Sequence, residues 1–140
     1  MEVTLVERTL TELDHVRLLN LLRRAARGEA SAPPRRTLED VLDGSTTVPT
    51  REVAPEVVTM RSQILLRDLR TGQRNTLTLC YPAEADPAVG LVSVLSPIGS
   101  ALIGMHAGSV ARWFNPSGGD HAAEIVAVLF QPESSGDYTA

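Results

Sequence analysis

The chain has 140 residues, of which 43% are hydrophobic and 4% aromatic, and its formal net charge at pH 7 is −4. These values predict one globular domain with an appendage, built around a small core of aliphatic side chains. The acidic balance argues against nucleic acid as the main partner, because binding to phosphate normally requires a net basic domain.

Membrane, disulfide and metal-binding classes are also disfavoured. No apolar run approaches the roughly 20 residues of a membrane span, and the N-terminal ten residues lack the pattern of a signal peptide. We therefore expect a cytoplasmic protein. The single cysteine, Cys80, excludes an intramolecular disulfide, and the three histidines (His15, His106 and His121) lack the spacing of metal ligands. No metal ion or other cofactor is expected.

The first predicted element is a helix over residues 11–27. Thr11 is a favourable N-cap, and Asp14 follows it by three residues, where a negative charge suits the positive end of a helix. Hydrophobic residues then recur at helical spacing as far as Ala26, and Gly28 is expected to end the helix.

A second, shorter helix is predicted after a turn rich in glycine and proline (28–34). Thr37 repeats the start signal with Asp40 three residues later, and Gly44 weakens or ends the helix. Two helices joined by a short turn predict an antiparallel hairpin. The following segment, 45–55, has the composition of a linker.

Beyond residue 57 the hydrophobic pattern changes from helical spacing to that of strands. Alternating or β-branched apolar residues predict strands at 63–68, 74–81, 91–95, 110–114 and 124–130. Thr71 and Gly72 indicate a hairpin turn between the first two. Ser96 and Pro97 predict the start of a short helix that ends near Gly104.

These elements predict an α+β fold in two parts. Residues 1–50 form the helical hairpin, and residues 51–140 form an antiparallel sheet with one short helix against it.

Several motifs in the second part resemble the Gre-type transcription factors. Residues 95–104 (LSPIGSALIG) are similar to a run in the C-terminal domain of the Gre transcript-cleavage factors. The chain resembles most closely the Rnk family, which is named for regulation of nucleoside diphosphate kinase. The blocks that carry this likeness are VVTM (57–60), LRDLRTGQ (66–73), LCYPAEADP (79–87) and QPESSGDY (131–138). The first sixty residues match only in layout.

The resemblance implies both a fold and a partner. In this family the C-terminal domain has an FK506-binding-protein-like (FKBP-like) fold and docks on RNA polymerase near the mouth of the secondary channel. The helical hairpin, a coiled coil, points into that channel. In the cleavage factors, acidic residues at its tip help to hold a second Mg²⁺ ion that activates water for RNA hydrolysis.

The hairpin of this chain differs from that of a cleavage factor in length and charge. A first helix of about 17 residues spans roughly 25 Å, against roughly 45 Å for the helices of about 30 residues in cleavage factors. The predicted tip contains five arginines and a single acid: Arg23, Arg24, Arg27, Arg35, Arg36 and Glu29. One carboxylate among guanidinium groups cannot form a Mg²⁺ site. We therefore expect no stimulation of transcript cleavage.

The arginine-rich tip admits three interpretations. It is a solvated turn, or its arginines meet acidic groups or RNA phosphate in the channel. Alternatively, the arginines pair within the hairpin with acids of the second helix, namely Glu39, Asp40 and Asp43. The sequence leaves all three open.

The resemblance places the contact with polymerase at the turn and short helix after residue 95. The residues expected there are Ser96, Pro97, Ile98, Ala101 and Leu102. Ile98 is the candidate for an exposed anchor, whereas Ala101 and Leu102 are expected to pack inward. Leu95 stands where cleavage factors usually have Asp, so this contact should be more hydrophobic. On residue chemistry alone, Ser96 and Pro97 are also a simple helix start.

Together these features predict a transcription regulator that is not an enzyme, and that inhibits transcription or competes with Gre factors on polymerase. One alternative is regulation of a metabolic partner such as nucleoside diphosphate kinase, which rests on the family name. Another is peptidyl-prolyl isomerisation, which rests on the FKBP-like fold. Such isomerases line their pocket with aromatic residues, and this chain has only five aromatic residues in all.

Overall fold

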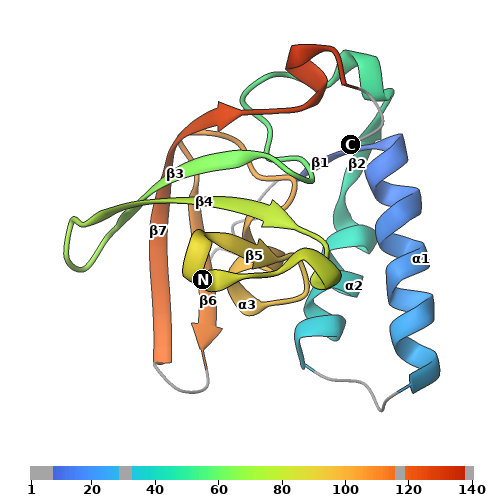
Figure 1. Ribbon diagram of the computed structural model, residues 1–140, viewed down its shortest axis with the longest axis horizontal. Coiled ribbons are helices and arrows are strands. Elements are labelled where there is room, and N and C mark those ends of the chain that lie inside the picture. Colours follow the sequence, from blue (N-terminus) through green and yellow to red (C-terminus); the bar gives the residue numbers. More distant parts are fainter. Residues whose placement is uncertain (1–7, 29–32, 116–118, 138–140) are drawn as a thin grey trace, which may run out of the picture.

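The computed structural model describes residues 8–28, 33–115 and 119–137. A helical hairpin lies on one side of the molecule, and a five-stranded sheet with a short helix lies on the other (Figure 1). This mixed arrangement of helix and sheet confirms the predicted α+β class.

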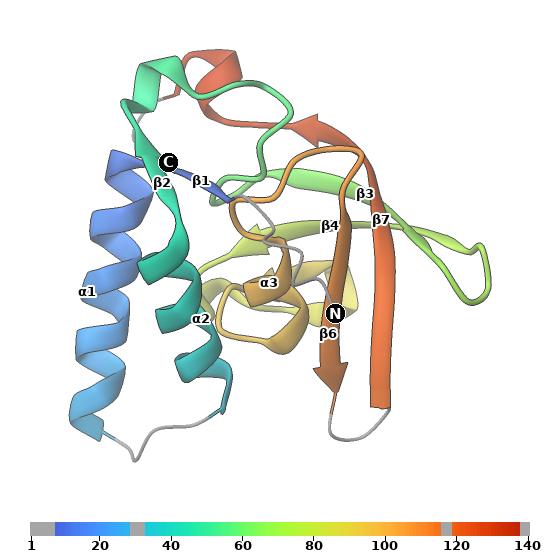
Figure 2. The same ribbon diagram turned by 180° about the vertical axis from the view of Figure 1, so that it is seen from behind.

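The hairpin consists of α1 (Glu12–Gly28) and α2 (Pro33–Gly44), which lie side by side in both views (Figures 1 and 2). The predicted start of α1 is confirmed, because the backbone N–H of Asp14 donates to Thr11 Oγ1 at 3.0 Å and so caps the helix. α2 begins earlier than the predicted Thr37, and its first two residues are prolines. Proline fits the first turn of a helix, where its missing N–H has no partner to lose.

The segment after the hairpin is not the linker expected over 45–55. Its residues Thr46–Val48 form β2, which pairs in parallel with β1 (Thr9–Thr11), and Thr50–Glu52 form a 3₁₀ turn. The antiparallel helices bring the start of α1 and the end of α2 to the same end of the hairpin, so these two short strands meet there. Neither strand has a run of alternating or β-branched apolar residues, and the Thr, Pro and Arg content of 45–55 therefore predicted a linker.

The large sheet has the strand order β5-β4-β3-β7-β6. Its strands are β3 (Gln63–Asp68), β4 (Arg74–Cys80), β5 (Leu91–Ser93), β6 (Val110–Asn115) and β7 (Gly119–Phe130). All five strands were predicted, and the hairpin of β3 and β4 is confirmed by their antiparallel pairing. The bounds differ most for β7, which begins ahead of the predicted residue 124.

The prediction of a wholly antiparallel sheet is wrong at one edge, because β5 pairs in parallel with β4. Between these strands the chain makes two 3₁₀ turns, Pro82–Glu84 and Pro87–Val89. A tight hairpin would have reversed the chain, whereas this longer connection carries it back so that β5 runs in the same direction as β4.

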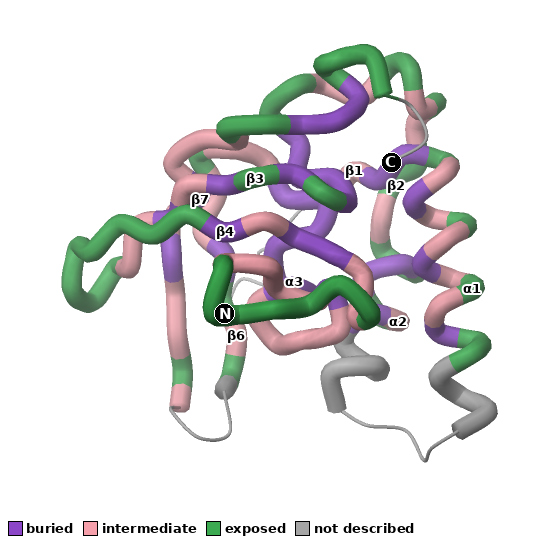
Figure 3. The backbone as a smooth tube through the Cα atoms, viewed as in Figure 1, coloured by how far each residue is buried: buried purple, intermediate pink, exposed green. Residues whose placement is uncertain are grey.

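The short helix α3 (Pro97–Leu102) lies between the sheet and α2, and it contacts both β6 and α2. Figure 3 shows the buried backbone gathered between the sheet, α3 and the inner sides of the hairpin. One hydrophobic cluster includes fully buried residues from both sides of the expected boundary at residue 50, among them Leu18, Leu38, Ile64, Leu102 and Ile125. The hairpin is therefore packed onto the sheet part through a shared core.

Candidate partner-binding surface

The turn that begins α3 is held by its own hydrogen bonds. Ser96 Oγ accepts from the backbone N–H of Gly99 at 3.1 Å and donates to the carbonyl oxygen of Ser93 at 2.6 Å. Pro97 occupies the first helical position, where a missing N–H is tolerated. The predicted helix start is thus confirmed, and the hydroxyl of Ser96 is used within the turn. We refer to residues 96–98 as the α3 turn.

Gly99 allows α3 to lie directly on the backbone that precedes it. A Cβ atom at this position would lie 2.0 Å from the carbonyl oxygen of Ser93 and 2.9 Å from the Cα of Val94. Real Cβ atoms do not approach backbone this closely, so only glycine fits here without a shift of the chain. The glycine of the motif therefore sets where the α3 turn sits on the sheet.

The five residues expected to contact polymerase fall into two groups. Ser96, Pro97 and Ile98 are partly exposed. Ala101 and Leu102 are 4% and 0% exposed, which confirms that they pack inward. Because they are buried, these two residues support the turn from below and offer no side chain to a partner. Ile98 also packs against the core, so only part of its side chain faces solvent.

The other end of α3 is held by Arg8. Its Nη1 donates to the carbonyl oxygens of Ser100 at 2.7 Å and Ile103 at 3.2 Å. The last carbonyls of a helix have no partner within the helix, and a cation is favourable beside them. Burial lowers the pKa of Arg8, but a guanidinium remains protonated in proteins. Through Arg8, the segment before α1 is bound to α3.

The tip of the hairpin lies at the end of the helices remote from β1 and β2 (Figures 1 and 2). Arg23 and Arg24 are exposed on α1. The backbones of Arg27, Arg35 and Arg36 belong to the helix ends that meet at this tip, but their side chains, like all of Glu29, lie outside the described part of the chain. How the arginines of the tip are paired therefore stays a prediction.

Asp14 joins the hairpin to the second part of the chain. Its Oδ2 accepts a hydrogen bond from the backbone N–H of Met60 at 3.1 Å, and the residue is 1% exposed. Burial raises the pKa of Asp14 to about 6; the Met60 hydrogen bond opposes this rise, and the charge of Glu133 adds to it. The sequence predicted an acid over the helix end, but not this contact with the second part.

A second buried carboxylate, that of Glu133, lies in the C-terminal tail. Glu133 is 5% exposed, and its Oε1 accepts from Thr59 Oγ1 at 2.7 Å. Nearby, Gln131 Nε2 donates to the carbonyl oxygens of Val57 at 2.9 Å and Ala54 at 2.7 Å. These contacts hold Gln131 and Glu133 against residues 54–59, whereas residues 134–137 are exposed and Tyr138 lies outside the described part.

Sequence reasoning missed a pocket between α1 and the end of β4. It has a volume of about 430 Å³ and is lined by Arg17, Asn20, Arg24, Arg61 and Tyr81. Of these residues, only Arg24 was singled out from the sequence. The helical spacing of Arg17, Asn20 and Arg24 was a usable signal. No sequence signal marked Arg61 or Tyr81, because these residues reach the pocket from distant positions in the chain.

His121 and Cys80, two further residues whose side chains could take part in chemistry, make packing contacts. Within the described ranges, no His, Cys, Asp and Glu side chains are grouped so as to hold a metal ion. His121 stacks on Trp113 with ring centroids 5.6 Å apart, and Cys80 is buried in β4. None of the described helices combines the length and apolar character needed to cross a membrane.

The comparison with known proteins identifies the family. Residues 53–130 match the family described as transcription elongation factor, GreA/GreB, C-term. The regulator of nucleoside diphosphate kinase from Escherichia coli (strain K12) is 33% identical over 129 residues, which cover 92% of this chain and 93% of that protein. The transcription elongation factor GreA of Geobacillus kaustophilus (strain HTA426) is 32% identical over 91 residues, 65% of this chain and 57% of that protein.

A solved structure shows the same likeness. The prokaryotic transcription elongation factor GreA/GreB from Nitrosomonas europaea is 34% identical and superimposes with a TM-score of 0.73, covering 88% of this chain and 99% of that one. The chain therefore belongs to the GreA/GreB family of transcription factors and, by its likeness along nearly the whole length, to the branch of the regulator of nucleoside diphosphate kinase.

Proposed function

We propose that this protein binds RNA polymerase near the mouth of the secondary channel and regulates transcription without catalysing a reaction. The observation that carries the proposal is the structural likeness to the Nitrosomonas europaea factor, which extends over hairpin and sheet alike. The relatives are regulators or elongation factors, which supports a regulatory role in the cytoplasm. In this proposal, residues 51–140 act as an FKBP-like docking domain and the hairpin acts as a short coiled coil.

The proposed anchor is the α3 turn. Pro97 and the exposed part of Ile98 form a small apolar surface. The backbone beneath them is held in place by the close approach at Gly99 and by the Ser96 cap. A rigid apolar anchor that fills a pocket on the partner contributes more binding free energy than scattered polar contacts. Leu95 precedes the turn and is partly buried against the core, and it brings no polar group to the proposed contact.

The hairpin is proposed to obstruct the channel without taking part in chemistry. α1 has 17 residues and α2 has 12, so the longer helix spans roughly 25 Å. A hairpin of this length enters a channel mouth but ends well short of the depth that a cleavage factor reaches. Its tip sequence contains five arginines and one acid, and these positive charges repel Mg²⁺.

Binding of polymerase by the full chain tests the proposed anchor. Ile98→Glu places a charge in a contact that excludes water, which typically costs a few kcal/mol, so we expect at least a tenfold loss of affinity for core polymerase. The matched control is Leu129→Glu, which adds the same charge at a residue of β7 that is 50% exposed. If Ile98→Glu, shown by circular dichroism to be folded, binds as well as the control, the α3 turn is not the anchor.

A second candidate function is regulation of nucleoside diphosphate kinase, which the printed name of the Escherichia coli relative favours. Affinity capture with the full chain from a cell lysate separates the two. Polymerase subunits among the captured proteins support the first proposal. Capture of the kinase without polymerase supports the second.

A further inference from the structure

Three arginines from two distant parts of the chain line one pocket. Arg17 and Arg24 come from α1 and Arg61 from the segment before β3, while Asn20 and Tyr81 complete the described lining. In Figure 1 the end of β4, which leads into Tyr81, points toward α1. The volume of about 430 Å³ falls within the range of pockets that hold small ligands.

The helix presents its part of the pocket as a row of hydrogen-bond donors. Arg17, Asn20 and Arg24 follow one another at intervals of three and four residues, which places them on one face of α1. Asn20 and Arg24 are exposed, and Arg17 is partly buried. Arg61 lines the same pocket from another segment, so donors reach it from two parts of the chain.

Arg61 is held in an unusual backbone conformation. Its φ of 66° is the only positive φ of a non-glycine residue among the described residues. Its guanidinium lies over the ring of Tyr81, 5.5 Å from the centroid, and contacts both carboxylate oxygens of Glu84 at 2.8 and 3.3 Å. Strained residues of this kind cluster at functional sites, and here two neighbours fix the direction of the charged group.

Tyr81 adds a further polar group to the pocket. Its hydroxyl oxygen is buried, and the guanidinium of Arg17 lies within reach of it. Burial raises the pKa of Tyr81, while the guanidinium of Arg17 is close enough to oppose this rise. The hydroxyl and the guanidinium of Arg17 therefore form one polar group on the wall of the pocket, which a ligand oxygen can contact.

The described lining of the pocket is positively charged. This lining contains three guanidinium groups and no carboxylate. Among the described residues, Glu84 pairs with Arg61 and the buried carboxyl group of Asp14 acts on Arg17, so these acids lie beside the pocket and not in its lining. Guanidinium groups gathered in this way repel one another and favour an anion between them.

We propose that this pocket binds the phosphate group of a small molecule, as a monophosphate or a diphosphate. A carboxylate offers two oxygens, which one forked guanidinium can satisfy. A phosphate monoester offers three acceptor oxygens and a charge of about −1.5 to −2 at neutral pH, which matches several arginines. Inorganic phosphate and a phosphorylated metabolite share this chemistry, and the experiment separates them.

Isothermal titration calorimetry on the full chain, at constant ionic strength, tests the proposal with inorganic phosphate and with pyrophosphate. Saturable binding is expected for at least one of them. Tighter binding of pyrophosphate indicates a ligand with a diphosphate, and comparable binding of both indicates a single phosphate. Arg24→Gln and Arg61→Gly should each weaken binding about tenfold, the loss of one charge-assisted contact.

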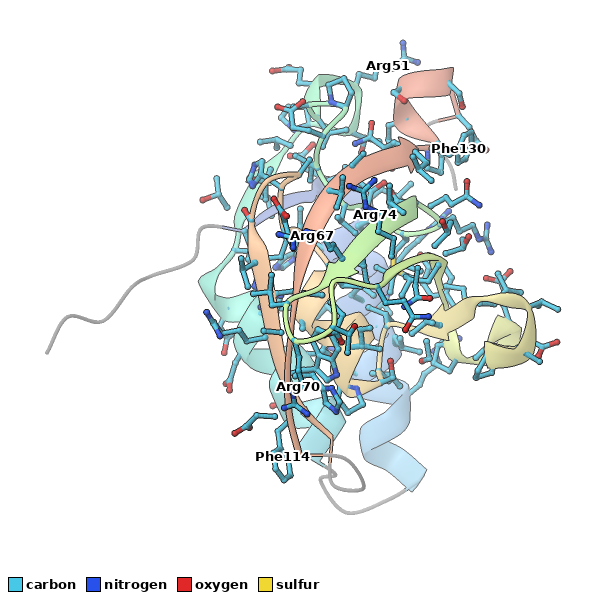
Figure 4. All side chains as sticks on the ribbon, turned by 90° about the vertical axis from the view of Figure 1, so that its left-hand side faces the viewer. Arg51, Arg67, Arg70, Arg74, Phe114 and Phe130 are labelled. Atoms are coloured by element: carbon cyan, nitrogen blue, oxygen red, sulfur yellow. The ribbon has the colours of Figure 1, made fainter. Side chains whose placement is uncertain are left out.

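Arg61→Gly separates binding from folding, because glycine adopts a positive φ without strain. Its melting temperature should therefore stay close to that of the original chain. Arg74→Gln is the matched control, since it removes the same charge from an exposed residue of the sheet (Figure 4). The proposal is overturned if neither anion binds saturably, or if the control weakens binding as much as Arg24→Gln. It is also overturned if an RNA oligonucleotide or a glutamate-rich peptide displaces pyrophosphate at lower concentration than a competing phosphate ester does.

Discussion

The carboxylate of Asp14 accepts a hydrogen bond from the backbone N–H of Met60 at 3.1 Å, and both residues are buried. This contact joins the first turn of α1 to the segment that leads into β3. It satisfies a backbone donor that would otherwise be buried without a partner. The arrangement also removes an ionisable group from water, so the strength of this junction depends on pH.

We predict that Asp14→Asn removes part of the pH dependence of stability. The folded-state pKa of Asp14 is about 6, above its ordinary value of 3.8, so folding favours the protonated acid. Its contribution to stability is complete below about pH 4 and is lost as the pH rises through about 6. The shift of roughly two pKa units corresponds to about 3 kcal/mol, and asparagine keeps an oxygen that accepts from Met60.

Urea unfolding at pH 4 and at pH 8 measures this effect. The variant and the original chain should have similar stability at pH 4, and the variant should be more stable at pH 8. Glu12→Gln is the control, because Glu12 lies in the same turn of α1 but is exposed. Parallel pH profiles for Asp14→Asn and the original chain would contradict the raised pKa of Asp14.

Gly99→Ala should destabilise the fold by about 2 kcal/mol or more, because overpacking against backbone forces a shift of the chain. The added Cβ would lie 2.0 Å from the carbonyl oxygen of Ser93. Gly44→Ala is the matched control, since a Cβ at Gly44 has no heavy atom within 4 Å. Thermal unfolding compares the two variants. Equal melting temperatures would show that α3 does not depend on this close approach.

Arg8→Met should lower stability by about 1–3 kcal/mol, because it leaves the carbonyl oxygens of Ser100 and Ile103 without their donor. Methionine preserves much of the apolar stem, so the loss reports mainly on the hydrogen bonds. Chemical denaturation provides the measurement, with Arg74→Met as a control on an exposed arginine. A loss no larger than that of the control would indicate that water replaces Arg8 at this helix end.

The tip of the hairpin should affect inhibition more than binding. The variant replaces five arginines by serine: Arg23, Arg24, Arg27, Arg35 and Arg36. Each exposed ion pair contributes under about 1 kcal/mol and weakens with salt, so docking on polymerase should remain while inhibition of transcription is relieved at low salt. Promoter-dependent transcription at two salt concentrations measures this. Unchanged inhibition would assign the effect to the docking domain.

The same hairpin should not accelerate transcript cleavage. Its longer helix spans roughly 25 Å, and its tip sequence has one acid among five arginines. Stalled, backtracked polymerase complexes should therefore release cleaved RNA at the same rate with and without the protein. A cleavage factor added to the same complexes serves as the positive control. Faster cleavage with this protein alone would refute the argument from length and charge.

Elements whose signals lie within a few residues were predicted well. The cap at Thr11, the turn at Gly72 and the helix start at Ser96 are all present, because each depends on hydrogen bonds or backbone angles between near neighbours. The errors arose where a partner elsewhere in the chain determines the structure. β2 forms because β1 lies beside it, and β5 runs parallel to β4 because of the connection between them.

The sequence by itself determined the span of α1, the start of α3, the positions of the main strands and the motif that marks the family. Local propensity, capping and hydrophobic spacing act over a few residues, so they can be read along the chain. Only the tertiary structure decided that Asp14 is buried against Met60, and that Arg61 and Tyr81 complete a pocket with α1. Desolvation and the gathering of charges depend on which distant residues meet, and that information exists only once the chain has folded.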